Sequence, residues 1–361
     1  MTAYIVVSTN GQVLTPAKLG TAKVNATGCN VGIYVAPNTK GVLISGLIIT
    51  GATDHGIFVQ DASSATIAHN TVTGNGVAKT AGIAEDKAIE LVGTSDSIVS
   101  DNTVTFNFAD GGIGIADDGA IDPGAPLSSG STPIASTANT VSGNYVKDNA
   151  AGCGIVVAAY NAGGGVGNNL VEDNTVIGNS VLDSAIKGFV GGIVVAADTP
   201  DTSVWSNTVK DNVVNGSLIP GIVIHSNAPG DAVKSTEIID NTLTYNGVET
   251  TNSFEPHMPA AIMVVSEIPH GGATITGTDI RANYANNNVY SVWYCNTSPS
   301  ITSQQGPVQN IGVCQATQPP PTSVPQFPLG AFGLVAVLAT GFVLLALMRR
   351  RMLLSSVRSS V

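Results

Sequence analysis

The sequence repeats one short motif six times: an Asn, usually followed by Thr-Val, with a second Asn five residues after the first. The pairs are Asn70/Asn75, Asn102/Asn107, Asn139/Asn144, Asn174/Asn179, Asn207/Asn212 and Asn241/Asn246. Successive first asparagines lie 32, 37, 35, 33 and 34 residues apart, so one unit recurs with a nearly constant period. Such a period predicts a stack of similar units rather than a single globular core.

The residues around each motif predict short strands. An apolar residue follows the first Asn by two positions in every copy. A second element, such as Gly56-Ile57-Phe58-Val59 or Gly154-Ile155-Val156-Val157, precedes the motif, and its first and third apolar residues can point to the same side. No window has the i, i+3, i+4, i+7 pattern of an amphipathic helix, which argues against a helical repeat. The sequence therefore predicts an all-β fold, a parallel β-helix with one coil per repeat.

The first asparagines are expected to stack at a corner between strands, about 4.8 Å apart. An amide group both donates and accepts hydrogen bonds, so stacked Asn side chains can bond to one another along the stack. The expected members of this ladder are Asn70, Asn102, Asn139, Asn174, Asn207 and Asn241.

From Asn30 to Val289 the chain resembles the right-handed parallel β-helix repeat proteins of the pectin-lyase-like superfamily. The Gly-Ile-x-Val and Asn-Thr-Val-x-x-Asn motifs, which recur in register, carry the resemblance. It implies a right-handed, single-stranded solenoid, and the motifs correspond to about eight coils. The superfamily includes polysaccharide lyases, hydrolases, epimerases, tail-spike proteins, copper-maturation proteins and non-catalytic surface proteins, so the fold alone does not select an activity.

The C-terminal part of the sequence predicts a membrane anchor. Leu329 to Met348 are twenty residues without a charge, long enough to cross a bilayer as a helix, and three arginines follow directly. The positive-inside rule then places the tail in the cytoplasm and the repeats outside the cell. The alternative is a buried core helix. We expect a β-helix domain over 1–294, a Cys-flanked and Pro-rich linker over 295–328, a transmembrane helix over 329–348 and a basic tail over 349–361.

The residues before this helix, Val324 to Gly330, resemble the Pro-x-Phe-Pro segment of archaeal surface-protein C-terminal anchors, some of which are sorting signals. Gln326 stands where the sorting form usually has Glu, so a cleaved tail and a retained helix are both open. The start of the sequence has no basic residue and only a short apolar run, unlike a signal peptide. We therefore expect the native start to lie upstream.

Cysteines and sequons fit a location outside the cell. Cys295 and Cys314 flank a polar stretch after the last expected coil, and a disulfide there would stabilise the chain by about 3 kcal/mol. Cys29 and Cys153 are expected to be small core residues. Asn25, Asn215 and Asn296 each begin an N-glycosylation sequon.

The charge pattern argues against nucleic acid as a partner. The net charge is −11, and four of the 14 basic residues lie in the C-terminal tail. Nucleic-acid binding needs clustered Lys and Arg, which the repeats lack.

The outward positions of the Gly-Ile-x-Val strands are mostly small and apolar, which suggests a covering loop or a partner surface. Only Glu90 and His225 among them can titrate usefully, and they are expected four coils apart, about 19 Å. The sequence therefore predicts no catalytic pair on this face. Asp54 and His55 form a further candidate, either an acid–base pair or a simple corner hydrogen bond.

Two other clusters could carry chemistry. Asp117, Asp118 and Asp122, with Glu85 and Asp86 one coil away, could bind calcium or serve as catalytic carboxylates, or could form a solvated acidic loop. A second cluster has the mixed His and Met composition that suits copper, although such residues also occur together by chance. Its members are His257, Met258, Met263 and His270.

The functional expectation is a membrane-anchored cell-surface protein with a structural or glycan- or protein-binding role, without catalysis and without a required cofactor. The alternative is a carbohydrate-active enzyme, a polysaccharide lyase or glycoside hydrolase that uses loop carboxylates. A third hypothesis is copper handling.

Overall fold

A computed structural model describes residues 1–76, 87–108, 111–119, 132–149, 152–179, 191–217, 220–247, 260–266 and 273–312. All of them belong to one compact unit, Met1–Pro320, and the second unit, Pro321–Val361, lies outside the described residues. The expected transmembrane segment, Leu329 to Met348, is therefore not described. Within the ranges given above, no helix has the length and apolar character needed to span a bilayer.

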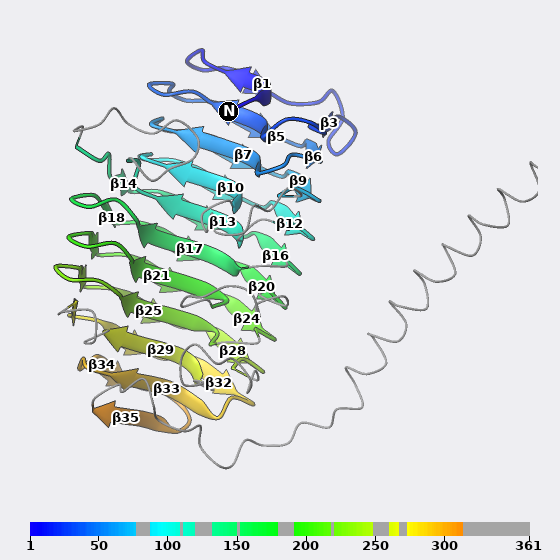
Figure 1. Cartoon of the computed structure of the whole chain (residues 1–361). Helices are drawn as coiled ribbons and strands as arrows, with labels where there is room; N and C mark the ends of the chain where they lie inside the picture. The colour runs from blue at the N-terminus through cyan, green and yellow to red at the C-terminus, as the bar shows by residue number, and fades with distance from the viewer. Residues whose placement is uncertain are drawn as a thin grey trace, which may run out of the picture. The chain divides into compact units, whose positions relative to one another are not determined.

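The described residues form parallel sheets that run side by side along a stack of coils (Figure 1). Sheet A has eleven strands: β1 (Ala3–Val7), β4 (Val31–Val35), β7 (His55–Gln60), β10 (Lys87–Val92), β13 (Gly111–Ala116), β17 (Cys153–Ala159), β21 (Ile193–Ala197), β25 (Ile222–Ser226), β29 (Ala260–Ser266), β33 (Tyr290–Cys295) and β35 (Val308–Gly312). Sheet B has ten: β2 (Val13–Leu14), β5 (Leu43–Ser45), β8 (Thr66–Ala68), β11 (Ile98–Ser100), β15 (Thr140–Ser142), β19 (Leu170–Glu172), β23 (Thr208–Lys210), β27 (Glu237–Ile239), β31 (Asp279–Arg281) and β34 (Ser300–Thr302).

Sheet C has nine strands: β3 (Lys23–Asn25), β6 (Ile48–Thr50), β9 (Thr71–Thr73), β12 (Thr103–Thr105), β16 (Tyr145–Lys147), β20 (Thr175–Ile177), β24 (Val213–Asn215), β28 (Thr242–Thr244) and β32 (Tyr284–Asn286). Sheet D is shorter: β14 (Ser136–Thr137), β18 (Gly165–Gly167), β22 (Ser203–Trp205), β26 (Ala232–Lys234) and β30 (Thr274–Thr276). Strands within a sheet pair in register with the next coil, so the chain is a parallel β-helix, as predicted.

One continuous apolar core runs through the inside of the stack. Equivalent isoleucines of successive coils, such as Ile57, Ile89 and Ile113, pair in register and are fully buried. Each coil thus covers the apolar residues of its neighbour, which is how a solenoid builds a core from short repeats. The stack continues through β34 and β35 to Gly312, beyond the expected end at residue 294, because coils without an asparagine motif also pair at both ends.

The strands of sheet A depart from simple alternation at the Gly of the Gly-Ile-x-Val motif. A Cβ atom on Gly56 would lie 2.5 Å from Cγ1 of the core residue Val72, so Gly56 faces inward, as does Ile57. Two consecutive inward positions turn the preceding residue, His55, to the outer face. Lys87 occupies the same position one coil later. The outer face therefore has three columns of side chains, not the two that strict period-2 alternation predicts.

The asparagines form hydrogen-bonded ladders, as predicted, but their membership differs. In the first ladder each Nδ2 donates to Oδ1 of the next rung at 2.9–3.0 Å, through Asn70, Asn102, Asn144, Asn174, Asn212, Asn241 and Asn283. Asn139 and Asn207 instead belong to a separate ladder with Asn169. A further ladder joins Asn75, Asn107, Asn149 and Asn179. The coils that include a strand of sheet D, from β14 to β30, have one more corner, five residues before the corner of the first ladder. Asn139 and Asn207 lie at this extra corner, whereas Asn174 and Asn241 lie at the corner of the first ladder.

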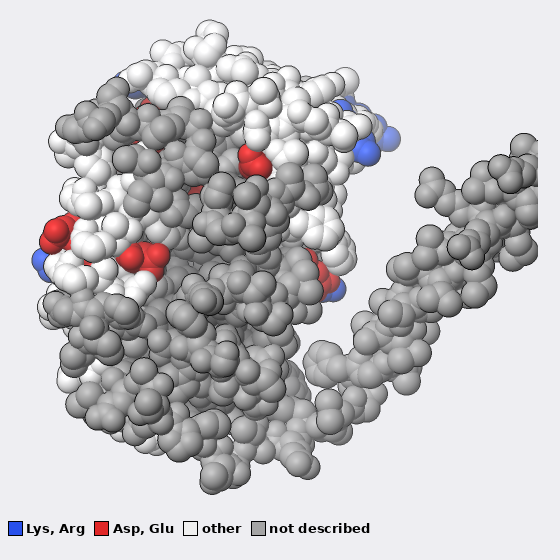
Figure 2. Space-filling view, viewed as in Figure 1, with Lys and Arg blue, Asp and Glu red and all other residues white. Residues whose placement is uncertain are grey.

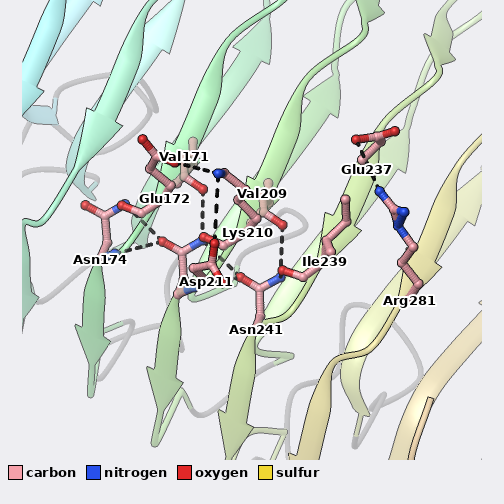
Figure 3. Close-up of polar contacts among 11 residues, drawn as sticks. Val171, Glu172, Asn174, Val209, Lys210, Asp211, Glu237, Ile239, Asn241 and Arg281 are labelled. Atoms are coloured by element: carbon pink, nitrogen blue, oxygen red, sulfur yellow. Dashed lines mark hydrogen bonds and ion pairs between the residues drawn. The ribbon is translucent and has the colours of Figure 1, made fainter. Parts of the chain in front are cut away.

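Each rung of the first ladder satisfies several buried polar groups at once. Asn174 donates from Nδ2 to the carbonyl oxygens of Val141 and Glu172 and to Oδ1 of Asn212. Figure 3 shows Asn174 and Asn241 in this ladder, next to an ion pair in which Lys210 Nζ lies 2.9 Å from Glu172 Oε2. The Glu172 carboxylate raises the pKa of Lys210. The corners are thus supports that join neighbouring coils.

Candidate functional site

The outer face of sheet A changes character along the stack. From β17 to β33 most of its side chains form one buried apolar cluster: Cys153, Val156, Ala158, Val194, Ala196, Val223, Ala260, Met263, Val265, Trp293 and Cys295. His225 of β25 is a buried polar residue on the same face. Over β7, β10 and β13, by contrast, the face carries buried polar residues: His55, Gln60, Lys87, Glu90, Asp117 and Asp118. We call these six residues the outer polar cluster. It is the candidate functional site.

His55, Lys87 and Glu90 form one half of the outer polar cluster. Nδ1 of His55 lies 3.0 Å from the carbonyl oxygen of Lys87 and 3.1 Å from Oε2 of Glu90. Both partners are acceptors, so the proton of the imidazole sits on Nδ1. The side chain of Lys87 is buried and runs across β13, where a Cβ on Gly111 or Gly114 would lie 2.7 Å from its methylene carbons. A carboxyl, an imidazole and an amino group thus lie on adjacent coils.

Gln60 and Asp118 form the other half. The hydroxyl of Tyr34 donates to Oε1 of Gln60 at 2.8 Å, and Nε2 of Gln60 donates to Oδ2 of Asp118 at 3.0 Å. Phe58 lies between the two halves, with its ring stacked on Tyr34 at 5.9 Å and on His55 at 4.7 Å between centroids. The cluster therefore has an aromatic centre and two polar ends.

Asp117 turns away from Asp118 and toward the next coil. Its carboxylate accepts hydrogen bonds from the backbone N–H groups of Tyr160 and Asn161 at 2.7 and 3.2 Å. Burial raises the pKa of Asp117 to about 6, although these hydrogen bonds oppose the shift. Two acids adjacent in sequence thus have separate environments.

The structure changes two predictions about this face. The titratable side chains of this face were expected to lie too far apart to meet, but Glu90 contacts His55, a residue that the two expected outward columns do not contain. Whether this contact has a catalytic role is not tested by the structure. Asp54 and His55 do not form the alternative pair: Oδ2 of Asp54 accepts a hydrogen bond from Nδ2 of Asn30 at 2.8 Å, while His55 contacts Glu90. The inward Gly of the motif was the available signal, because it shifts the preceding residue outward.

The other predicted sites are described only in part. Asp122, Glu85 and Asp86 lie outside the described residues, as do His257, Met258 and His270. Met263 is buried in the apolar cluster of β29. Over the described ranges, no group of three or more His, Cys, Asp or Glu side chains could hold a metal ion. The calcium and copper hypotheses based on these residues remain predictions.

Cysteines and sequons have distinct places in the stack. Cys295 is disulfide-bonded, and Cys29 and Cys153 are thiols. Cys314 lies outside the described residues, so its pairing with Cys295 remains a prediction. The sequon residues Asn25 and Asn215 end strands of sheet C, and Asn296 directly follows β33.

Exposed aromatic side chains form a second candidate surface, along sheet C. Phe106 is 59% exposed in the corner after β12, and Tyr145 of β16, the next coil, is 39% exposed. Tyr245 and Tyr284 repeat this arrangement at β28 and β32, with 43% and 46% of their surface exposed. Tyr145 pairs with Thr103 and Tyr284 with Thr242, each three residues before the corner aromatic. We call these the two aromatic pairs. They are four coils apart, about 19 Å along the stack. Sheet C, which carries them, runs along the right-hand side of the stack of coils in Figure 1.

The corner aromatics have an unusual backbone conformation. Phe106 and Tyr245 both have φ of 55°, in the left-handed region that bulky residues rarely adopt. Gly74, Gly178 and Gly216 stand at the same corner in other coils. A large exposed ring at a corner where glycine is favoured adds strain and no core packing, which is a reason to look for function there.

The sheet topology and the asparagine ladders define this chain as a parallel β-helix. Residues 9–204 match the family described as right handed beta helix region, and the chain belongs to that family. No curated protein sequence matches it significantly.

Several solved structures are similar in fold. The alginate lyase of Paenibacillus sp. str. FPU-7 is 15% identical, with 84% of this chain and 91% of that chain covered and a TM-score of 0.41. The A-module of the mannuronan C-5 epimerase AlgE4 of Azotobacter vinelandii is 14% identical, with 87% and 81% covered and a TM-score of 0.41. At this level of similarity they say nothing about the activity of this chain.

Proposed function

We propose that this chain is a non-catalytic cell-surface rod that binds a neutral glycan along sheet C. The two aromatic pairs carry this proposal, because they place four exposed rings in the same arrangement at two points of one edge. Two equivalent sites on a stiff scaffold can engage one extended chain together, which raises avidity beyond that of either site.

The chemistry of the edge favours a neutral, hydroxyl-rich partner. Aromatic rings offer apolar faces for the C–H groups of a sugar, and strand hydroxyls supply donors and acceptors beside them. Thr103, Thr175 and Thr242 are partly exposed in the same row of sheet C as the two tyrosines. The few charged residues on the described surface in Figure 2 are of both signs, and beside Tyr145 the side chain of Lys147 pairs with Asp148 at 3.4 Å, so a ligand of one charge meets no surface of uniform opposite charge there.

The location at the cell surface rests on the sequence. The uncharged segment Leu329 to Met348 and the arginines after it support a C-terminal anchor with the β-helix outside the cell. The sequons at Asn25, Asn215 and Asn296 are compatible with export.

Binding of the purified full chain to an array of neutral glycans and polyuronates tests this function. Removing both pairs through Phe106→Gly, Tyr145→Thr, Tyr245→Gly and Tyr284→Thr is expected to abolish binding to neutral glycans. Other coils already have glycine at the corner position, as Gly74, and threonine at the strand position, as Thr103, so the variant should keep the fold. Tyr4→Thr, which removes a 56% exposed ring from sheet A, is the matched control. Equal glycan binding by the fourfold variant, or binding only to protein partners, would contradict the proposal.

A carbohydrate-active enzyme is the second candidate, and the contact between His55 and Glu90 favours it. A carboxylate, an imidazole and a lysine on adjacent coils can supply acid and base groups for cleavage of a glycosidic bond. All three side chains are buried, however, so a substrate would have to displace whatever excludes solvent from them. Incubating the full chain with polyuronates and neutral glycans decides between the two. Release of unsaturated or reducing ends that is lost in Glu90→Gln would replace the non-catalytic proposal.

A further inference from the structure

Asp118 has a buried carboxylate oxygen without a partner. Its side chain is fully buried, and Oδ2 accepts the hydrogen bond from Gln60. Among the described residues Oδ1 has no hydrogen-bond partner, and none of their lysines, arginines or histidines forms an ion pair with this carboxylate. Burying an ionised carboxylate in this way is costly unless a cation or a proton compensates the charge.

A second carboxylate approaches the same place from another coil. Asp61 follows β7, Gly93 follows β10 and Asp118 lies just past β13, so the three residues belong to consecutive coils. A Cβ atom on Gly93 would overlap Oδ1 of Asp61 and lie 2.9 Å from Cβ of Asp118. The two acidic side chains therefore meet over the one residue that has no side chain, and Oδ1 of Asp61 is also buried there.

We infer that Asp61 and Asp118 hold a calcium ion over Gly93. Calcium takes oxygen ligands from carboxylates, carbonyls and water in a flexible arrangement. Two carboxylates from different coils leave the remaining positions to backbone oxygens and water, while an aqueous magnesium ion gives up its waters reluctantly. The hydrogen bonds from Tyr34 to Gln60 and from Gln60 to Asp118 orient the Asp118 carboxylate, so that Oδ1 is the oxygen left for the ion.

This site differs from the acidic set expected from the sequence. Asp117 is not a ligand, because its two oxygens accept backbone hydrogen bonds from Tyr160 and Asn161. Asp61 was not in that set, since it precedes Asp118 by just over two full coils. The ion would link three coils, which adds a stabilising function beyond the proposed binding of glycan at sheet C.

The test is calcium binding by the purified full chain after dialysis against EDTA. We expect calorimetry to show that the wild type binds one more calcium ion per chain than Asp118→Asn does. An amide oxygen at position 118 can still accept the hydrogen bond from Gln60, so this variant keeps the local geometry. Calcium at about 10 mM, above the dissociation constants of about 0.1–1 mM that are common in extracellular modules, should raise the Tm of the wild type only. Asp173→Asn, at an exposed corner, is the matched control and should keep both responses.

Asp61→Asn is the second variant, for the case that Asp118→Asn does not fold, and it should lose the same site. Absence of calcium binding to the wild type overturns the inference, as does unchanged binding stoichiometry in both carboxamide variants. A wild type that ignores calcium but gains Tm as the pH falls, with Asp118→Asn already stabilised at neutral pH, would show that a shared proton replaces the ion. Each of these results is independent of glycan binding, so failure here leaves the proposed function intact.

Discussion

His55 and Glu90 join two neighbouring coils across the outer face of sheet A. Nδ1 of His55 lies 3.1 Å from Oε2 of Glu90, and both side chains are buried. The same nitrogen contacts the carbonyl oxygen of Lys87 at 3.0 Å, so the imidazole donates to two acceptors of the β10 strand. In later coils the column of Glu90 contains Val156, Val194 and Met263, which shows that the scaffold itself does not require a polar group there.

Replacing Glu90 by Leu is expected to lower the free energy of unfolding by about 3 kcal/mol. The change leaves two buried donors, Nδ1–H of His55 and the backbone N–H of Lys87, without the carboxylate that accepts from them, and removing the charged partner of a buried hydrogen bond is costly. Glu90→Gln keeps an oxygen acceptor and should cost about 1 kcal/mol. Urea unfolding, monitored by circular dichroism, measures the free energy of unfolding of both variants. A Glu90→Leu variant as stable as the wild type would mean that the contact contributes nothing to folding.

Asn144 in the first ladder should be far less tolerant of Asp than of Ser. Its Nδ2 donates to the carbonyl oxygens of Val99 and Ser142 and to Oδ1 of Asn174. A carboxylate would put an oxygen against three acceptors in a buried corner, so we expect Asn144→Asp to cost about 4 kcal/mol.

Serine is the matched control for this ladder position. Ser217 stands in a corner whose backbone N–H donates to Oδ1 of Asn246, so a hydroxyl is compatible with the stack. We expect Asn144→Ser to cost about 2 kcal/mol. Equal costs for the two variants in chemical denaturation would contradict the role assigned to the amide donors.

The sequence predicted the architecture for the right physical reason but with the wrong alignment of coils. Stacked amides do form ladders, yet the rungs of the first ladder are separated by 32, 42, 30, 38, 29 and 42 residues. The nearly constant period arose because Asn139 and Asn207 were counted in place of Asn144 and Asn212. Loop lengths differ between coils and the extra corner of sheet D is only five residues away, so spacing alone could not assign each Asn to its corner.

The candidate site was only partly predictable for a related reason. Glu90 was correctly placed on the outer face, but His55 and Lys87 were missed because strict alternation assigns them to the interior. Alternation breaks where the motif glycine lies against the core, as Gly56 does against Val72, and the motif glycine was the one sequence signal of this break. The meeting of Asp61 and Asp118 depends on pairing between coils separated in sequence, which no local pattern contains.

Replacing Phe106 by Gly should stabilise the fold while it weakens glycan binding. Phe106 has a φ of 55° and is 59% exposed, so glycine would relieve strain without leaving a cavity. We expect a gain of about 1 kcal/mol in the free energy of unfolding, and the same for Tyr245→Gly. Tyr145→Thr, which changes a ring on an ordinary strand, is the control and should not gain stability. A loss of stability in Phe106→Gly would show that the ring packs usefully, and the argument from strain would fail.

His225 should make the protein less stable as the pH falls below 6.5. Burial between Ala196 and Val265 lowers the pKa of His225, and the negative charge of Asp198 opposes the shift only in part. The unfolded chain therefore binds the proton first, and the free energy of unfolding should fall by up to about 1.4 kcal/mol per pH unit below 6.5, until the folded-state pKa is reached. His225→Val matches the neighbouring column residue Val265 and should remove this part of the pH dependence. The measurement is urea unfolding at several pH values between 7 and 5, compared between wild type and variant. If the free energy of unfolding depends on pH in the same way in both proteins, His225 has the same pKa in the folded and unfolded states, and the prediction is wrong.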